Sequence, residues 1–111
     1  MTAAKRRVLL DACVPQELRH RLSVFDVMTA RYANLHTLKN GALLAAAEGR
    51  FDVLVTVDAS MAQQQNLHGR TLSIVVARVK ANRLPELLAL LPQLRAAVQT
   101  VSPGHVAVVR G

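Results

Sequence analysis

The chain has 111 residues, which fits one domain comfortably and two poorly, so we expect a single domain over residues 1–111. Hydrophobic residues make up 51% of it, mostly Val, Leu and Ala, which is enough for a core without disulfides or a structural metal. Fourteen Lys and Arg against seven Asp and Glu give a formal net charge of +7, which favours polyanionic partners such as RNA, DNA or an acidic protein. No apolar stretch reaches the ~18 residues of a membrane span, so no membrane association is expected.

Cys13 is the only cysteine, which excludes an internal disulfide and a multi-cysteine zinc site. A chain without disulfides suits a reducing cytoplasm, and the apolar run over residues 8–10 is far too short for a signal-peptide core. Free cysteines are among the most buried residue types, so we expect Cys13 to be a small buried side chain and not a nucleophile.

Short apolar runs alternate with helical segments along the chain. The runs predict buried strands over about residues 6–11, 24–30, 52–57, 72–79 and 106–109. Helices are expected over about residues 15–22, 40–49, 60–66 and 84–101. This alternation predicts an α/β fold: a three-layer, Rossmann-like domain with a five-stranded, mainly parallel sheet. The expected strand order is 2-1-3-4-5, which makes the first and third strands neighbours.

Particular residues indicate where the helices begin, end and bend. Asn40 and Ser60 are candidate N-caps, and Gly49 is a candidate C-terminal stop. Pro92 is expected to kink the helix over residues 84–101. That helix carries more leucine than one buried face needs, so part of it covers a partner, such as a second copy in a homodimer, or it simply spans the sheet.

Two aspartates follow strands that are predicted to be neighbours. Asp11 ends the first strand and Asp58 ends the third, and neighbouring strands lie about 5 Å apart. Two carboxylates at that distance repel each other unless a cation or a shared proton lies between them. Mg²⁺ or Mn²⁺ is the expected cation because both prefer oxygen ligands. Either aspartate alone is equally well explained as a helix cap.

Polar and basic residues are expected around this pair. Asn40 either offers a side-chain oxygen to the same edge or serves only as an N-cap. The basic residues that follow strand ends or precede helices on this rim are Arg31, Lys39, Arg78, Lys80 and Arg83. Gln64, Gln65 and Asn66 are candidates for contacts with exposed bases or for hydrogen bonds to the rim. Carboxylates surrounded by cations are the arrangement expected for binding or cutting a phosphodiester. The four histidines lack metal-ligand spacing and are assigned no role.

Four segments, in order along nearly the whole chain, resemble the small PIN-like proteins of bacterial toxin–antitoxin operons, relatives of VapC-like toxins and of the Mut7-C domain. The segments are LLD at 9–11, KNG at 39–41, VTVD at 55–58 and QQQNL at 63–67. The resemblance implies a PIN-like fold, a divalent-metal site of clustered carboxylates, and ribonuclease activity restrained by a protein antitoxin.

Residue by residue, the resemblance matches Asp11 to the first-strand aspartate of the family and Asp58 to the aspartate of its T-x-D motif. Asn40 falls where many relatives have an aspartate. The sequence departs from the family at Ala12, where relatives commonly have an acid, and at Ser60, near where many have another.

Three functions remain open at this stage. The first is a metal-dependent endoribonuclease toxin in which Asp11 and Asp58 bind the metal and Asn40 orients the metal-bound water. The second is a non-catalytic module that binds RNA or an antitoxin-like partner through its basic rim, which the missing acids favour. The third is a receiver-like or flavodoxin-type domain, but receivers usually carry an acidic pair after the first strand and a lysine after the last, and this chain has neither.

Overall fold

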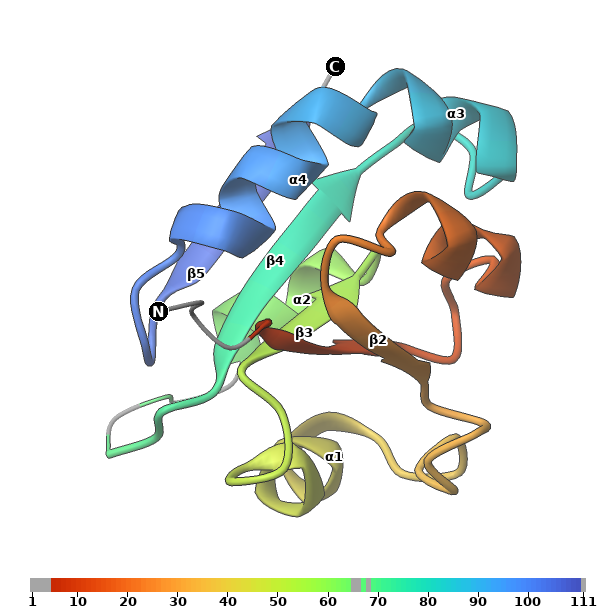
Figure 1. The fold of residues 1–111 in the computed structure, drawn as a ribbon. Coiled ribbons are helices and arrows are strands. Elements are labelled where there is room, and N and C mark those ends of the chain that lie inside the picture. The colour runs from red at the N-terminus through yellow and green to blue at the C-terminus, as the bar shows by residue number, and fades with distance from the viewer. Residues whose placement is uncertain (1–4, 65–66, 68, 111) are drawn as a thin grey trace.

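In the computed structural model, five parallel strands form one twisted sheet with helices on both faces (Figure 1). The structure describes residues 5–64, 67 and 69–110. The strands are β1 (Arg7–Leu10), β2 (Asp26–Thr29), β3 (Val53–Thr56), β4 (Ser73–Arg78) and β5 (Val106–Arg110). Their order is β2-β1-β3-β4-β5 and every pairing is parallel, so the predicted α/β class and strand order are confirmed, and the sheet is wholly parallel.

The helices follow the predicted segments with two differences. They are η1 (Gln16–Arg21), α1 (Asn40–Ala47), α2 (Ala59–Gln64), α3 (Leu84–Ala89) and α4 (Leu91–Thr100). The first is a 3₁₀ helix, a form that short segments of this kind adopt. The long C-terminal helix is interrupted at Leu90 and is not merely kinked. Pro92 lies in the first turn of α4 and has no N–H to continue the hydrogen-bond ladder of α3.

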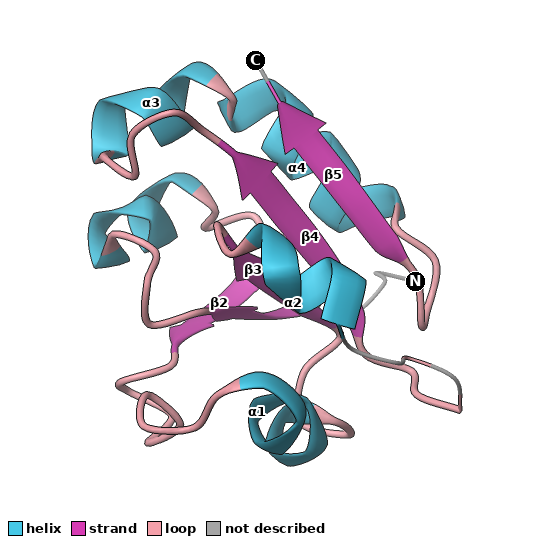
Figure 2. Ribbon diagram, turned by 180° about the vertical axis from the view of Figure 1, so that it is seen from behind, coloured by secondary structure: helices cyan, strands magenta, loops and turns pink. Residues whose placement is uncertain are grey.

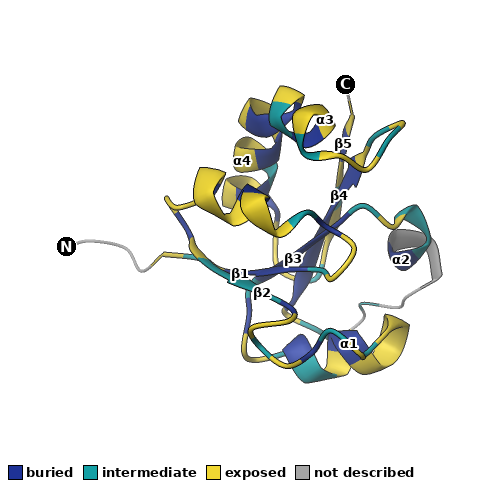
Figure 3. Ribbon diagram, turned by 90° about the vertical axis from the view of Figure 1, so that its right-hand side faces the viewer, coloured by how far each residue is buried: buried dark blue, intermediate teal, exposed yellow. Residues whose placement is uncertain are grey.

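The sheet separates two apolar clusters, because successive strand residues point to opposite faces. Val8 and Leu10 pack with η1, α3 and α4, whereas Leu9 packs with α1 and Met61 of α2. Seen from behind, α2 lies on the face of the sheet opposite α4 (Figure 2). The strands are buried in the middle and the outer sides of the helices are exposed (Figure 3). The three-layer arrangement leaves the carboxyl ends of the strands open at one edge.

The leucines of the C-terminal helices cover the sheet. Leu87, Leu91 and Leu94 are buried in the cluster beneath α3 and α4. Among the described residues, the exposed large apolar side chains are Val24, Tyr32, Val106 and Val108. The leucine content of α3 and α4 is therefore explained by packing within the chain. No helix within residues 5–64 and 69–110 combines the length and the apolar character needed to cross a membrane.

Candidate functional site

A cavity of about 500 Å³ opens at the carboxyl ends of β1 and β3. It is formed by the β1–η1 loop, the segment that enters α1, and the β3–α2 connection. The lining residues are Asp11, Ala12, Cys13, His36, Leu38, Lys39, Asn40, Leu43, Val57, Asp58, Ser60 and Met61. The fold therefore brings Asp11 and Asp58, which are distant along the chain, to the wall of one cavity.

Asp11 is half-buried and held in place on both sides of its carboxylate. Its backbone N–H continues the β1–β3 ladder with a 2.9 Å bond to the carbonyl of Val55. Its Oδ1 accepts the N–H of Ala12 at 2.8 Å, and its Oδ2 accepts the hydroxyl of Thr56 at 2.7 Å. These bonds fix the direction in which the carboxylate faces the cavity.

Thr56, the last residue of β3, connects the two aspartates. Its side chain is fully buried, and while its hydroxyl donates to Asp11 it accepts the N–H of Asp58 at 3.1 Å. No role of its own was predicted for Thr56. The available signal was a single hydroxyl at the end of an otherwise aliphatic buried strand, since a buried hydroxyl needs a partner.

Asp58 caps helix α2. Its Oδ1 accepts the N–H of Ser60 at 3.0 Å and the hydroxyl of Ser60 at 2.6 Å. The prediction of Ser60 as the N-cap was therefore wrong. Asp58 immediately precedes the first helical residue, where a carboxylate reaches the free N–H groups of the first turn. Both bonds are to Oδ1, and a cap of this kind needs only one oxygen of a carboxylate.

Asn40 lies on the cavity wall but does not cap α1, so the N-cap prediction for it was also wrong. The cap position is Lys39, and no side chain makes a cap hydrogen bond there. Asn40 is the first residue of the helix and has a φ of +50°. Asn is one of the few residue types that tolerate this left-handed conformation. Both Lys39 and Asn40 line the cavity.

Two further residues in the cavity differ from the sequence-based expectations. Cys13 was expected to be a buried apolar residue, but it is exposed. Its Sγ lies 3.5 Å from Oδ2 of Asp11 and 3.6 Å from Oγ1 of Thr56. Although the residue as a whole is exposed, its sulfur is partly desolvated, and this desolvation, together with the charge of Asp11, raises the pKa of the thiol. His36 was assigned no role, yet it lines the cavity, and its buried Nδ1 has no hydrogen-bond partner within the described residues. No spacing motif signals His36, because the loop between β2 and α1 places it.

The predicted basic rim divides into two groups. Lys39 lines the main cavity, and Arg31 lines an adjoining cavity of about 230 Å³ together with Asp11. Arg78, Lys80 and Arg83 are exposed at the end of β4 and in the connection to α3, and they do not line the cavity that holds the aspartates.

The β4–α3 connection nevertheless contacts the site. The side-chain amide of Asn82 donates to the carbonyl of Cys13, a contact that the sequence did not indicate. Of the predicted base contacts, Gln65 and Asn66 lie outside the described residues. Gln64 ends α2, and its side chain also lies outside what the structure describes.

The two aspartates of the site lie close to two cations, Lys39 in the same cavity and Arg31 in the adjoining one. Among the described residues, the ion pair within 4 Å is Arg7 with Asp52, at 3.2 Å and at the opposite edge of the sheet. There, hydrogen bonds and the charge of Arg7 outweigh the desolvation of Asp52 and keep the pKa of its carboxyl low. Arg31 and Lys39 have no such carboxylate partner in the described chain, so they remain available to an anionic ligand.

The donor chemistry of the cavity suits a hard divalent cation. The described residues contain no group of three or more His, Cys, Asp or Glu side chains that would form a complete metal cage. Asp11 and Asp58 provide two carboxylates, and Mg²⁺ typically binds through one or two carboxylates, several waters and the phosphates of a substrate. The number and type of oxygen donors at the cavity are therefore within the range that a magnesium site uses.

Comparison of the chain with protein-family models, with curated proteins and with solved structures found no match.

Proposed function

We propose that this chain is a divalent-metal-dependent endoribonuclease of the PIN-like class that acts in the cytoplasm as the toxin of a bacterial toxin–antitoxin pair. The observation that carries the proposal is the position of Asp11 and Asp58 on one cavity wall at the carboxyl edge of a parallel sheet. This edge is where ligands of open α/β sheets bind. The toxin role and the antitoxin partner rest on the motif resemblance and on the net charge of +7.

Four residues that line the cavity, and Thr56 behind them, have a defined part in this proposal. Asp11 and Asp58 would hold Mg²⁺ or Mn²⁺, which supplies a bound water of lowered pKa and neutralises phosphate charge. Thr56 keeps Asp11 aimed at the cavity through its 2.7 Å bond. The side-chain amide of Asn40 provides a donor and an acceptor beside the scissile phosphate, and Lys39 binds a phosphate oxygen as a point charge.

A second candidate, a catalytically inert module that binds RNA or a protein partner, is favoured by a different observation. Ala12 and Ser60 occupy cavity positions at or near which a nuclease of this class would carry further acids. Both aspartates also serve local structure, since Asp11 bonds to Thr56 and Asp58 caps α2. In this alternative the two carboxylates are retained for the fold alone.

Cleavage assays with matched variants test the proposal. Wild-type protein is incubated with a panel of single-stranded RNAs in Mg²⁺ or Mn²⁺, and cleavage is expected. Asp11→Asn and Asp58→Asn are each expected to abolish it, whereas Asp26→Asn, an exposed carboxylate at the start of β2, serves as the control. Asn is as good an N-cap as Asp, so Asp58→Asn should keep α2 intact and separate lost chemistry from lost stability.

Calorimetry distinguishes the two candidates. Binding of Mn²⁺ by the wild-type protein that both Asp→Asn variants weaken supports the nuclease. Intact RNA across the panel in both metals, with no metal binding and with salt-sensitive RNA binding, identifies the inert module instead.

A further inference from the structure

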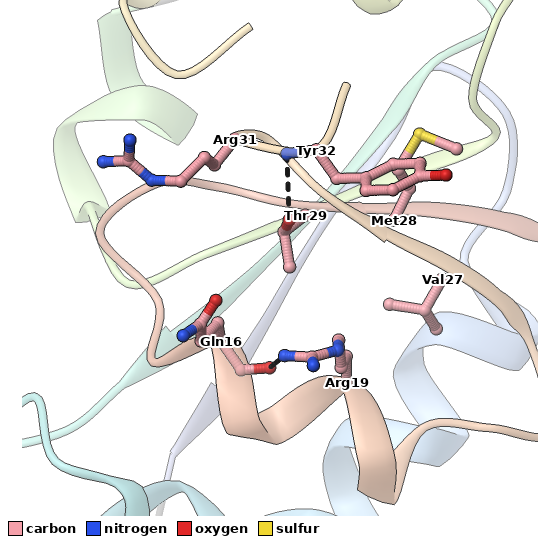
Figure 4. Close-up of a pocket in the computed structure, with 7 residues that line it drawn as sticks. All are labelled: Gln16, Arg19, Val27, Met28, Thr29, Arg31 and Tyr32. Atoms are coloured by element: carbon pink, nitrogen blue, oxygen red, sulfur yellow. Dashed lines mark hydrogen bonds between the residues drawn. The ribbon is translucent and has the colours of Figure 1, made fainter. Parts of the chain in front are cut away.

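A second cavity, of about 570 Å³, lies between η1 and the segment that follows β2 (Figure 4). It is lined by Gln16, Arg19, Val27, Met28, Thr29, Arg31 and Tyr32. Its floor is partly apolar and its rim carries two guanidinium groups and an aromatic ring. Because β2 is an edge strand, this cavity is open to solvent at the side of the sheet.

Tyr32 presents its ring to solvent at this cavity. The residue is 80% exposed, far more than its aromatic side chain would be in a structural role. Its backbone N–H donates to Oγ1 of Thr29 at 3.1 Å, which holds the turn after β2 in place. Met28 and Val27 line the same cavity, so the ring stands at the edge of a partly apolar wall (Figure 4). An exposed aromatic ring is the feature that single-stranded nucleic acids use for base stacking.

Two arginines, Arg19 and Arg31, line the same cavity as this ring. Arg31 directly precedes Tyr32, and Arg19 lies across the cavity on η1, where its Nη1 donates to the carbonyl of Gln16 at 3.2 Å. Both side chains are exposed, and neither is within 4 Å of a carboxylate in the described chain. A base on Tyr32 would therefore have cations available to its neighbouring phosphates.

The Tyr32 cavity and the aspartate cavity both adjoin a third, smaller cavity. The small cavity of about 230 Å³ shares Gln16, Thr29 and Arg31 with the Tyr32 cavity. It shares Asp11 and Ala12 with the aspartate cavity. The residues that line the three cavities thus trace a path from Tyr32 past Arg31 to Asp11.

We propose that the Tyr32 cavity is a nucleotide subsite for single-stranded RNA. An unpaired base stacks on the ring of Tyr32, Arg19 and Arg31 bind the phosphates that flank it, and the strand continues along the path to Asp11. The RNA class of the ligand rests on the proposed function, whereas the stacking site rests on the geometry of the Tyr32 cavity. A folded RNA duplex does not fit this site, because its bases are stacked on one another and not free to stack on a side chain.

Tyrosine fluorescence provides a direct test, because Tyr32 is the only tyrosine and the chain has no tryptophan. The full chain is titrated in EDTA with an oligoadenylate of about ten nucleotides. N-acetyltyrosinamide in a parallel titration corrects for absorption by the nucleic acid. We expect saturable quenching by the single strand and none by a duplex of the same length.

Affinity measurements with end-labelled RNA complete the test. Tyr32→Ala is expected to weaken binding at least about fivefold, as the loss of one stacked base does, whereas Tyr32→Phe keeps the ring and changes binding less than about twofold. Val24→Ala is the matched control, because Val24 is another exposed apolar side chain and does not line the Tyr32 cavity.

Three outcomes would overturn the subsite. The first is RNA binding that does not quench the fluorescence of Tyr32. The second is quenching by polyglutamate as strong as that by single-stranded RNA. The third is an RNA affinity of Tyr32→Ala equal to that of the wild-type protein. Since EDTA removes metal and cleavage from the measurement, the subsite and the nuclease fail separately. Quenching without any RNA cleavage supports the Tyr32 subsite and contradicts the nuclease proposal. Cleavage without quenching supports the nuclease proposal and contradicts the subsite.

Discussion

The hydroxyl of Thr56 donates a 2.7 Å hydrogen bond to Oδ2 of Asp11, across the boundary between the ends of two neighbouring parallel strands. The same hydroxyl oxygen accepts the N–H of Asp58 at 3.1 Å. One fully buried side chain therefore sets the position of both aspartates of the cavity. The link depends on the parallel pairing of β1 with β3, in which Leu10 lies opposite Val55.

Replacing Thr56 by Val is expected to destabilise the protein by about 1–3 kcal/mol, because Asp11 and the N–H of Asp58 each lose a buried partner. Thr56→Ser keeps the hydroxyl but removes a buried methyl, at a cost of about 1 kcal/mol. Urea denaturation measures both values. RNA cleavage should survive in the Ser variant and be lost in the Val variant. Equal cleavage by the two would show that Thr56 does not position Asp11 for catalysis.

Lys39→Gln is expected to reduce RNA cleavage more than Lys80→Gln, although each removes one positive charge. Lys39 lines the aspartate cavity and Lys80 does not. The dependence of RNA affinity on salt concentration should become shallower by about one phosphate contact in the Lys39 variant only. Identical losses in both variants would point to a diffuse electrostatic attraction and not to a contact in the cavity.

Glu48→Gln is expected to lower the melting temperature at neutral pH but to have little effect in acid. The Glu48 carboxylate accepts the hydroxyl and N–H of Thr71 and the N–H of Leu72, and these bonds lower its pKa from the ordinary value of 4.5. A lowered carboxyl pKa stabilises the fold above the unfolded-state pKa, and this stabilisation is lost as the pH falls through the folded-state pKa. The melting temperatures of the wild-type protein and the Glu48→Gln variant should therefore differ at pH 7 and converge at about pH 3. A constant difference between the two proteins at both pH values would contradict this assignment.

Gly104→Ala is expected to destabilise the protein more than Gly49→Ala. Both glycines have a positive φ, of +73° and +82°, so both alanines carry a strain of about 1–2 kcal/mol. A Cβ at Gly104 would also lie 2.7 Å from the backbone carbonyl oxygen of Arg70, whereas a Cβ at Gly49 meets nothing within 4 Å. Urea denaturation of the two variants measures the difference. A Gly104 variant as stable as the Gly49 variant would show that the loop before β5 shifts freely.

The sequence by itself determined the architecture. Uninterrupted aliphatic runs such as residues 53–55 are typical of strands buried on both faces, and the spacing between these runs allows parallel crossovers. It also located Asp11 and Asp58, because residues that end neighbouring parallel strands must share an edge. Local sequence rules were sufficient for these features, because the features depend on the hydrophobic periodicity of each segment and on the lengths of the connections between segments.

The tertiary structure alone decided which side chains cap helices and which side chains contact one another at the carboxyl edge of the sheet. Whether Ser60 or Asp58 caps α2 depends on which side chain reaches the free N–H groups, and that follows from the turn at the end of β3. The contacts of Thr56, and the cavity that Tyr32 shares with Gln16 and Arg19 of η1, involve residues from separate segments, and the exposure of Cys13 depends on how such segments pack. No periodicity in the sequence encodes such contacts, because they depend on the packing of segments that are far apart in the chain.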